Sequence, residues 1–281
     1  MNYEIEMMKY ANQLKIISNN KEIGIEHKKN KEGVFMGTKI ILNSDGFRNS
    51  NNLKSNSKKI LMLGDSMTLG WGANKPFANI LNKKIRNYEV INAGIGNTNT
   101  IMQVENFFNN HESKYKYDII VLNFFINDFE NVKVKEPNII EKYSLFYTFF
   151  LNKLNTILIK FRLKKNWIDF YSGNYKNEKI IEISLNKILK LNNYCKKNNI
   201  KFLIHNIPEL RNLNNYKFNE ETNIIKNFAD KNKIKFIDSY DVLKKFKPEE
   251  LWVTKLDPHA NDKAHFIMAN FILKKISYMF N

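Results

Sequence analysis

The sequence predicts an α/β protein built on one parallel β-sheet with helices on both faces. Five short apolar runs, each bounded by polar or Gly residues, are typical of the buried strands of such a sheet. Stretches with helical spacing lie between them, which is the pattern of strand–helix–strand units. The 281 residues, 43% of them hydrophobic, suffice for one such domain with a sizeable insertion. The expected strands are Lys59–Leu63, Glu89–Asn92, Asp118–Phe125, Lys201–Asn206 and Lys235–Asp238.

The segments between these runs carry helix signals. Pro76 opens one of them, because proline is favoured in the first turn of a helix. Asn261 and Asp262 open the last one, where apolar residues recur at helical spacing. The expected helices are Phe77–Arg86, Thr100–Asn110, Lys179–Asn198, Glu220–Lys231 and Asn261–Met279.

Two segments fall outside this alternation and define the expected domain organisation. Residues 1–58 are polar, contain a turn signal at Asp45-Gly46, and indicate an arm packed on a domain that spans residues 59–281. Residues 131–178 lie between the third and fourth strands and indicate a helical insertion.

The insertion contains the aromatic run Tyr143–Leu151 and, further on, the basic stretch Lys160–Lys165. We expect a long amphipathic helix or a pair of helices, and Asn152 and Lys153 interrupt the run too early for a membrane span. The aromatic side chains cannot all remain in water without cost, so they need a partner. Docking on the parent domain ranks first, with or without a role as a lid over the site. A homodimer ranks second and a membrane surface last.

The formal net charge of +17 suggests nucleic-acid binding at first sight, but the kind of basic residue argues against it. Only four of the 45 basic residues are Arg, the side chain that reads bases and phosphates in a bidentate manner, and the Lys are scattered. A solvated basic surface is the expected role. Cys195 is the single cysteine, so no intrachain disulfide can form, and its surroundings show no metal or redox spacing. The N-terminus lacks the features of a signal peptide, which predicts a cytoplasmic location.

The first stretch that carries chemistry is Ile60–Gly70, where a buried strand runs through Gly64 and Asp65 into Ser66. Functional sites of open parallel sheets form at the carboxyl ends of the strands. A helix that begins at this point would also direct backbone N–H groups at an anion beside Ser66. The alternative is an ordinary strand-to-helix turn with Ser66 as a cap. The stretch is not the nucleophile elbow of α/β-hydrolases, because Thr68 stands where their second Gly belongs.

Two further stretches supply partners for a serine nucleophile. A serine hydroxyl needs a base, and the base needs an orienting group; Asp257 and His259, two apart in a turn, can form such a pair. Asn127, after the third strand, can donate its amide to a developing oxyanion. Taken singly, Asp257 and His259 are better explained as a turn residue and a surface histidine, and Asn127-Asp128 can be a strand-terminating turn, which Asn and Asp favour.

Together these stretches resemble the SGNH hydrolase family, also called GDSL-like. Gly64–Ser66 matches the nucleophile block of the family, and Asn92–Asn97 is similar to its Gly block. Asn127-Asp128 resembles the Asn block, and Asp257–His259 resembles the C-terminal Asp/His block. The four blocks occur in the order of the family and cover roughly residues 59–281. Residues 43–48 are similar to a lead-in found in bacterial members encoded near surface-polysaccharide genes.

The resemblance implies a three-layer α/β/α, flavodoxin-like domain with five parallel strands in the order 2-1-3-4-5. It implies that Ser66 is the nucleophile, that His259 is its base and that Asp257 orients the base. The oxyanion hole would comprise the Ser66 N–H, a backbone N–H of the Gly block and the Asn127 side chain. Many members have a Gly where this chain has Asn97, so the donor of that block is either Gly96 or Asn97. Many members also place the Asp three residues before the His rather than two.

The function that follows from the resemblance is a serine ester hydrolase that needs no metal and no cofactor. The expected substrate is a carbohydrate or other small ester that carries an acetyl or short acyl group. An O-acyltransferase acting on a glycan, a lipid esterase or thioesterase, and a non-enzymatic polysaccharide-assembly module are the alternatives. The oligomeric state is open.

Other conspicuous side chains are expected to be structural or are undecided. His205 lies within a strand and His265 in the last helix, so both are expected to be structural. For Trp71 and Trp252, a place in the wall of a substrate pocket and a purely structural packing role are equally expected. Glu209 follows the fourth strand, and a surface position is expected for it.

Overall fold

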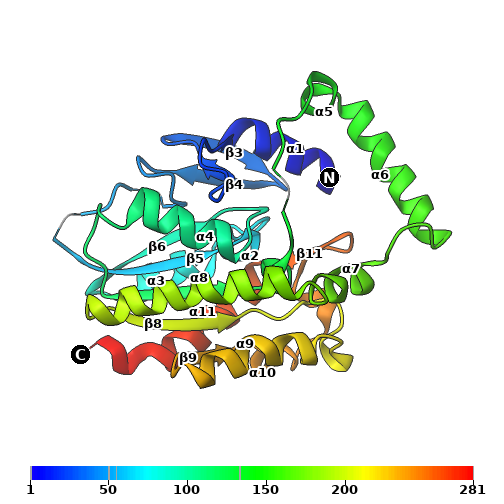
Figure 1. Cartoon of the computed structure of the whole chain (residues 1–281). Helices are drawn as coiled ribbons and strands as arrows, with labels where there is room; N and C mark the ends of the chain where they lie inside the picture. The colour runs from blue at the N-terminus through cyan, green and yellow to red at the C-terminus, as the bar shows by residue number, and fades with distance from the viewer. Residues whose placement is uncertain (1, 50, 55, 133, 281) are drawn as a thin grey trace.

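The computed structural model describes residues 2–49, 51–54, 56–132 and 134–280, and its centre is a five-stranded parallel sheet (Figure 1). The strand order is β6-β5-β7-β8-β9, which in chain order reads 2-1-3-4-5, and every neighbouring pair is parallel. The predicted fold class and strand order are therefore confirmed. The strands are β5 (Lys58–Gly64), β6 (Tyr88–Gly94), β7 (Ile119–Phe124), β8 (Lys201–Asn206) and β9 (Lys235–Asp238).

Helices cover both faces of this sheet, because successive side chains of each buried strand point to opposite sides. On β5, Ile60 and Met62 join a core with α3 and α11, whereas Leu61 and Leu63 join the core on the other face with α4, α8 and α9. The result is a three-layer α/β/α arrangement. The helices are α3 (Phe77–Lys84), α4 (Thr100–Asn106), α8 (Glu178–Lys197), α9 (Asn219–Lys231), α10 (Tyr240–Leu243) and α11 (Asp262–Ile276).

Two of the expected helices continue past their α-helical ends with a different winding. Helix α4 passes into a π-helical turn, η1 (Phe107–His111), and α11 passes into a 3₁₀ turn, η5 (Ser277–Phe280). Such changes of winding are common at helix termini and cannot be read from hydrophobic spacing. Two further 3₁₀ turns, η3 (Leu213–Asn215) and η4 (Pro248–Glu250), lie in the second half of the chain.

The N-terminal arm contains more regular structure than its polar composition indicates. It begins with α1, after which two small hairpins, β1–β2 and β3–β4, lie against the domain. Tyr10 and Phe35 of the arm form a small core with Leu69 and Trp71, which follow strand β5. The arm is thus packed on the site edge of the sheet. Its elements are α1 (Tyr3–Leu14), β1 (Lys15–Ile17), β2 (Ile25–His27), β3 (Lys31–Phe35) and β4 (Thr38–Leu42).

The insertion forms three helices, α5 (Ile139–Tyr143), α6 (Leu145–Lys160) and α7 (Trp167–Asn174). Helix α7 packs on the domain through Trp167, Ile168 and Tyr171. Helices α5 and α6 stand away from the sheet (Figure 1), and most aromatic side chains of α6 are exposed. The expectation that the aromatic run docks on the parent domain is therefore wrong for α6. In the described part of the chain, no helix has the length and apolar character needed to cross a bilayer.

A single buried guanidinium ties the arm to the loop after the first sheet strand. Arg48 is 4% exposed, and its Nη1 donates to the carbonyl oxygens of Leu69 and Gly70 at 2.8 and 2.6 Å. Its Nη2 donates to Ala73 O at 2.8 Å and to Lys39 O at 3.3 Å. Carbonyl oxygens at the end of a short helix need such donors, because the helix itself provides none. Arg48 therefore fixes the turn that follows the predicted nucleophile.

We expect Arg48→Lys to lower the free energy of unfolding by about 2–3 kcal/mol, because one ammonium cannot replace the planar fork that serves four carbonyl groups. Urea denaturation measures the change. Arg86→Lys is the matched control, since Arg86 is exposed and the same exchange there should change stability by less than about 0.5 kcal/mol. Equal effects of the two substitutions would contradict the role of Arg48.

Candidate active site

The site lies at the carboxyl ends of β5, β6 and β7, where α2 (Ser66–Leu69) follows β5 without a connecting loop. Two glycines allow α2 to approach the sheet closely. A Cβ atom on Gly94 would lie 2.2 Å from Leu69 N, and one on Gly64 would lie 2.1 Å from Thr68 Oγ1. No side chain fits in either place. The approach places Ser66 at the first turn, where it is 7% exposed.

Ser66, His259 and Asp257 form one continuous chain of hydrogen bonds. Ser66 Oγ lies 3.0 Å from His259 Nε2, although the two residues are 193 positions apart. His259 Nδ1 lies 2.6 Å from Asp257 Oδ1. Because a carboxylate can only accept, Nδ1 carries the proton and Nε2 is left to accept from the serine hydroxyl. This is the tautomer that a serine nucleophile requires of its base.

The carboxylate of Asp257 is held from two sides. One oxygen accepts from His259, and the other accepts from Trp71 Nε1 at 3.0 Å. Burial alone would raise the pKa of Asp257, but the hydrogen bonds from His259 and Trp71 outweigh it and hold the pKa below its usual value. Asp257 therefore stays ionised beside the base. Trp71 is 1% exposed, so it orients Asp257 rather than lining an open pocket.

The Asp/His pair lies on a strand rather than in the expected turn. Strand β11 (Asp257–Ala260) pairs antiparallel with β10 (Trp252–Thr254), and the register shifts between Trp252 and Thr254. The extended backbone lets the backbone N–H of His259 also donate to Asp257, at 3.2 Å. A spacing of two residues therefore suffices to bring the carboxylate to the imidazole. The departure from the spacing of three found in many SGNH members is thus compatible with the pairing.

The arm contributes an aromatic side chain that sequence reasoning missed. The Tyr3 ring of α1 stacks on the His259 imidazole, with centroids 5.7 Å apart and an interplanar angle of 25°. It also meets the edge of Trp71 at 6.1 Å. Burial and the negative charge of Asp257 raise the pKa of Tyr3, so its hydroxyl stays protonated. Nothing in the sequence pairs residue 3 with residue 259, since the contact exists only after the arm has docked.

The backbone N–H groups of Gly96 and Asn97 in the Gly block differ in their hydrogen bonds among the described residues. Gly96 N–H donates to Tyr10 Oη at 3.1 Å, and Tyr10 Oη lies 2.6 Å from His27 Nε2. His27 Nδ1 lies 3.0 Å from Gly46 O, which can only accept, so Nδ1 carries the proton and Nε2 accepts from Tyr10. Burial lowers the pKa of His27 to about 3, which keeps the ring neutral.

Asn97 is the residue of this block that faces solvent. Its φ is +64°, a left-handed conformation that Gly favours and Asn tolerates, which explains why Asn can replace Gly here. Within the described residues its backbone N–H makes no hydrogen bond, in contrast to Gly96. The two candidates that the sequence left open therefore differ in availability, and Asn97 has the available donor.

Asn127 lies directly after β7 in a 3₁₀ turn, η2 (Ile126–Phe129). Its side chain interacts with the carboxylate of Asp65, the residue that precedes Ser66 and caps α2 by accepting from Met67 N at 2.8 Å. Asn127 Oδ1 is buried and has no partner among the described residues. The Asn block is thus held next to the nucleophile block through Asp65.

Asp65 and Asp128 are two fully buried carboxyl groups next to each other behind the site. Burial raises the pKa of Asp65, although the Met67 N–H, His259 and Asn127 partly offset it. Burial, reinforced by the negative charge of Asp65, raises the pKa of Asp128 well above its usual value. Asp128 accepts from Phe125 N at 2.7 Å and from Gln103 Nε2 at 2.6 Å. One charge on Asp65 thus favours a proton on Asp128.

Glu209 is buried at 2% exposure, so the expectation of a surface position is wrong. Its carboxylate accepts from Arg211 Nη1 at 2.6 Å and from Arg211 N at 2.8 Å, and the guanidinium lies 4.9 Å from the ring centroid of Trp167. Burial raises the pKa of Glu209, and the charges of Arg211 and His259 lower it in part. Glu209 and Arg211 therefore lie close enough to His259 to contribute to the electrostatic field at its imidazole.

The other singled-out side chains are structural. His205 is fully buried, with its ring nitrogens 2.9 Å from Asn123 Oδ1 and 2.7 Å from Ser239 Oγ. His265 accepts from Phe77 N at 3.2 Å, and Trp252 donates to Leu210 O at 3.0 Å. The predictions for both histidines are confirmed. Within the described residues, no three His, Cys, Asp or Glu side chains cluster as metal ligands would.

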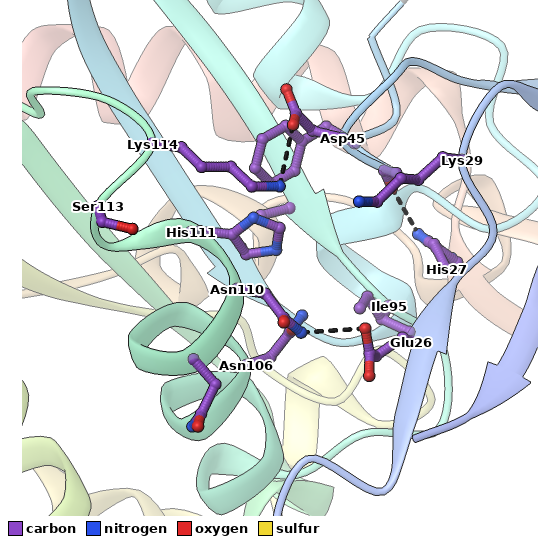
Figure 2. A pocket seen from close by; sticks show the side chains of 14 residues that line it. Glu26, His27, Lys29, Asp45, Ile95, Asn106, Asn110, His111, Ser113 and Lys114 are labelled. Atoms are coloured by element: carbon purple, nitrogen blue, oxygen red, sulfur yellow. Dashed lines mark hydrogen bonds and ion pairs between the residues drawn. The ribbon is translucent and has the colours of Figure 1, made fainter. Parts of the chain in front are cut away.

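Figure 2 shows a polar pocket between the arm and the segment around η1, and its volume is about 270 Å³. Polar groups in it pair with one another: Lys114 Nζ lies 3.0 Å from Asp45 Oδ1, and Asn110 donates to Glu26 at 3.0 Å. His27, the partner of Tyr10, forms part of its wall. The pocket thus marks where the arm meets the helix η1, and none of the predicted catalytic residues lines it.

Solved structures with a similar fold exist. An α/β hydrolase from the metagenome of Lake Arreo, Spain, matches with a TM-score of 0.50 at 13% identity, covering 82% of this chain and 99% of that chain. A member of the lipolytic G-D-S-L family from Veillonella parvula matches at 0.48 and 15% identity, with coverages of 79% and 99%. An acetyl xylan esterase matches at 0.46 and 19%, with coverages of 78% and 99%. No protein-family model and no curated protein matches the sequence. At these identities, the likeness to the first establishes a common fold.

We expect Asp128→Asn to raise the free energy of unfolding near neutral pH. Native Asp128 keeps its proton above the pH at which an unfolded Asp loses it, so folding takes up a proton and loses stability as the pH rises. Asn needs no proton, and a flip of Gln103, whose Oε1 lacks a partner among the described residues, lets the new amide be satisfied.

Denaturation at several pH values measures this difference. The advantage of the variant should grow as the pH rises above about 4, the usual value for Asp, and vanish below it. Asp230→Asn on the exposed end of α9 is the control and should show no such trend. A variant that is less stable than the wild type at all pH values would contradict a protonated Asp128.

Proposed function

We propose that the protein is a serine-dependent ester hydrolase of the SGNH type that works through an acyl-enzyme. The observation that carries the proposal is the continuous Ser66–His259–Asp257 hydrogen-bond chain at the carboxyl edge of a parallel sheet. Its supporting features are the ionised Asp257 and the tautomer of His259 that the carboxylate enforces.

In the first half-reaction, Ser66 Oγ attacks the ester carbonyl carbon while His259 Nε2 takes its proton. Collapse of the tetrahedral intermediate breaks the ester C–O bond, and the imidazolium returns the proton to the leaving alkoxide. Water then repeats the sequence on the acyl-enzyme, which frees the carboxylic acid and restores Ser66. Asp257 stabilises the imidazolium in both halves and keeps its own charge.

The negative charge that develops on the carbonyl oxygen requires donors that are in place beforehand. We assign the Ser66 N–H, the Asn97 N–H and the Asn127 side-chain amide to this role. Gly96 is a support rather than a donor, because its N–H is engaged by Tyr10. Preorganised donors of this kind are worth roughly 3–4 kcal/mol each in related chemistry.

The substrate we propose is a small ester, an acetyl or short acyl group on a carbohydrate. Ser66 is nearly buried, and Tyr3 covers the base, so the space over the nucleophile suits a small acyl group. Glu209 lies within the field of His259 and pairs with Arg211, whose guanidinium lies over Trp167 and hydrogen-bonds to Tyr171. Such flat and hydrogen-bonding groups suit a sugar ring. An acetyl xylan esterase is among the structures with a similar fold.

Ser66→Ala should abolish the hydrolysis of 4-nitrophenyl acetate, with a loss of roughly 10⁴–10⁶-fold in kcat, because it removes the hydroxyl that lies against the proposed base His259. A fluorophosphonate probe should label the wild type once per chain and leave the variant unlabelled. Mass spectrometry of the labelled peptide identifies the site.

Ser57→Ala provides the matched control, since Ser57 lies at the opposite end of β5 and should keep full activity and labelling. Thermal denaturation of Ser66→Ala checks that the fold is retained. A variant with wild-type turnover, or a label on another residue, would show that Ser66 is not the nucleophile.

Tyr10→Phe should lower kcat by roughly tenfold and leave KM nearly unchanged. The Tyr10 hydroxyl accepts from the Gly96 N–H and so fixes the backbone beside Asn97. Without it the Asn97 N–H can shift, and because this donor serves the transition state, kcat falls and KM does not. The pH profile of kcat should keep its shape, because His27 is neutral across the working range.

Tyr117→Phe is the matched control, because its buried hydroxyl donates to His111 O at 3.0 Å and lies far from the site. Both variants should lose about 1–2 kcal/mol of stability, and only Tyr10→Phe should lose kcat. If the two variants have equal kcat values while Ser66 still labels, Tyr10 is merely structural and the nucleophile assignment stands.

A further inference from the structure

Helix α6 leaves a large apolar surface uncovered. Phe146 is 78% exposed, Phe150 54% and Ile157 51%, values that are rare for such side chains in a folded domain. The helix contacts the rest of the chain on its other side, where Thr148 meets Met8 of α1. Figure 1 shows α6 at the rim of the molecule, clear of the sheet and of the helices that cover it.

Helix α6 exposes apolar side chains around much of its surface, and Leu145, Leu151, Leu154 and Ile159 are among them. A subset of the exposed side chains, large apolar residues and two lysines, lies on one face and forms a continuous stripe along the helix. The stripe consists of Phe146, Phe149, Phe150, Lys153, Ile157 and Lys160. It continues into the turn after α6, where Phe161 is 68% exposed and Leu163 73% exposed.

The charge of this segment has one sign. Residues 144–168 contain five basic side chains and no acidic one. Three of the five, Arg162, Lys164 and Lys165, lie in the exposed turn at the end of the stripe. Aromatic and aliphatic side chains flanked by Lys and Arg are the composition of surfaces that enter the boundary between lipid headgroups and acyl chains.

We propose that α6 and the turn that follows it, residues 145–165, dock on a membrane that carries anionic lipids. The apolar side chains of the stripe enter the interface, while Lys153 and Lys160 extend towards the headgroups. The helix lies on the bilayer and does not cross it, because its 16 residues are too few to span the hydrocarbon core. The overall charge of +17 adds attraction to the same surface.

The charge decides between this occupant and a second copy of the chain. Two copies of residues 144–168 in contact would bring ten basic side chains together without an acidic residue from either segment. Attraction to a soluble polyanion would satisfy the charge but would leave the aromatic side chains in water. An anionic bilayer accommodates both the basic residues and the aromatic side chains. The inference rests on α6 alone and does not depend on the proposed function.

Sedimentation with large unilamellar vesicles tests it, with phosphatidylcholine alone or with 30% phosphatidylglycerol. The full chain should bind the anionic vesicles at least tenfold more tightly than the neutral ones. Phe146→Ser combined with Phe150→Ser should remove most of the binding. Lys153→Gln combined with Lys160→Gln should weaken it about 20-fold, since each cation near an anionic surface contributes about fivefold.

Lys197→Gln combined with Lys231→Gln is the matched control, because both side chains are exposed on other helices and the charge change is the same. This pair should weaken binding to anionic vesicles by less than about threefold. Absence of binding to anionic vesicles, or equal loss with both lysine pairs, would overturn the proposal. So would a dimer in lipid-free solution, shown by light scattering, that the Phe146/Phe150 variant converts to a monomer. Circular dichroism confirms that each variant is folded.

Discussion

The close approach of α2 to β5 and β6 is the contact on which the candidate site depends. It exists because Gly64 and Gly94 present no side chain where the helix backbone passes. It is completed by Arg48, whose guanidinium satisfies the carbonyl oxygens that a four-residue helix leaves open. Without this approach, Ser66 would stand too far from the sheet edge to meet an imidazole delivered by the last hairpin. A contact between backbones thus sets the position of a side-chain hydroxyl.

The buried carboxyl groups around this contact differ in protonation for reasons that the structure makes explicit. Asp257 receives hydrogen bonds on both oxygens and keeps its charge, which suits a group that must stabilise an imidazolium. Asp128 lies beside another buried acid and favours its proton, which suits a group that only organises the backbone. Both carboxyl groups accept hydrogen bonds on both oxygens, so the neighbouring group separates their roles: an imidazole beside Asp257 and a second buried acid beside Asp128.

Residues near the ends of the sheet strands could be predicted from the sequence, because parallel strands bring their carboxyl ends to one edge. The fold class followed from the alternation of apolar runs and helical stretches, the strand order from the resemblance to the SGNH family, and the structural roles of His205 and His265 from their places in a strand and a helix. Glu209 was misjudged, because its burial depends on pairing with Arg211, and an average preference for the surface does not reveal such a pairing. The left-handed conformation of Asn97 could have been predicted from its residue type, because Asn is one of the few residues that tolerate this conformation.

The secondary structure and contacts of the arm could not be predicted from the sequence. Its polar composition gave no indication of a helix and two hairpins, because small elements that pack on a larger domain need few apolar side chains of their own. Tyr3 reaches His259, Tyr10 reaches Gly96, and Arg48 reaches the turn after Ser66, each across a separation that no local pattern encodes. These three contacts reach His259, the Gly block that carries Asn97, and the turn after Ser66. The arm is therefore part of the candidate site, because its side chains contact His259, the Gly block and the turn after Ser66.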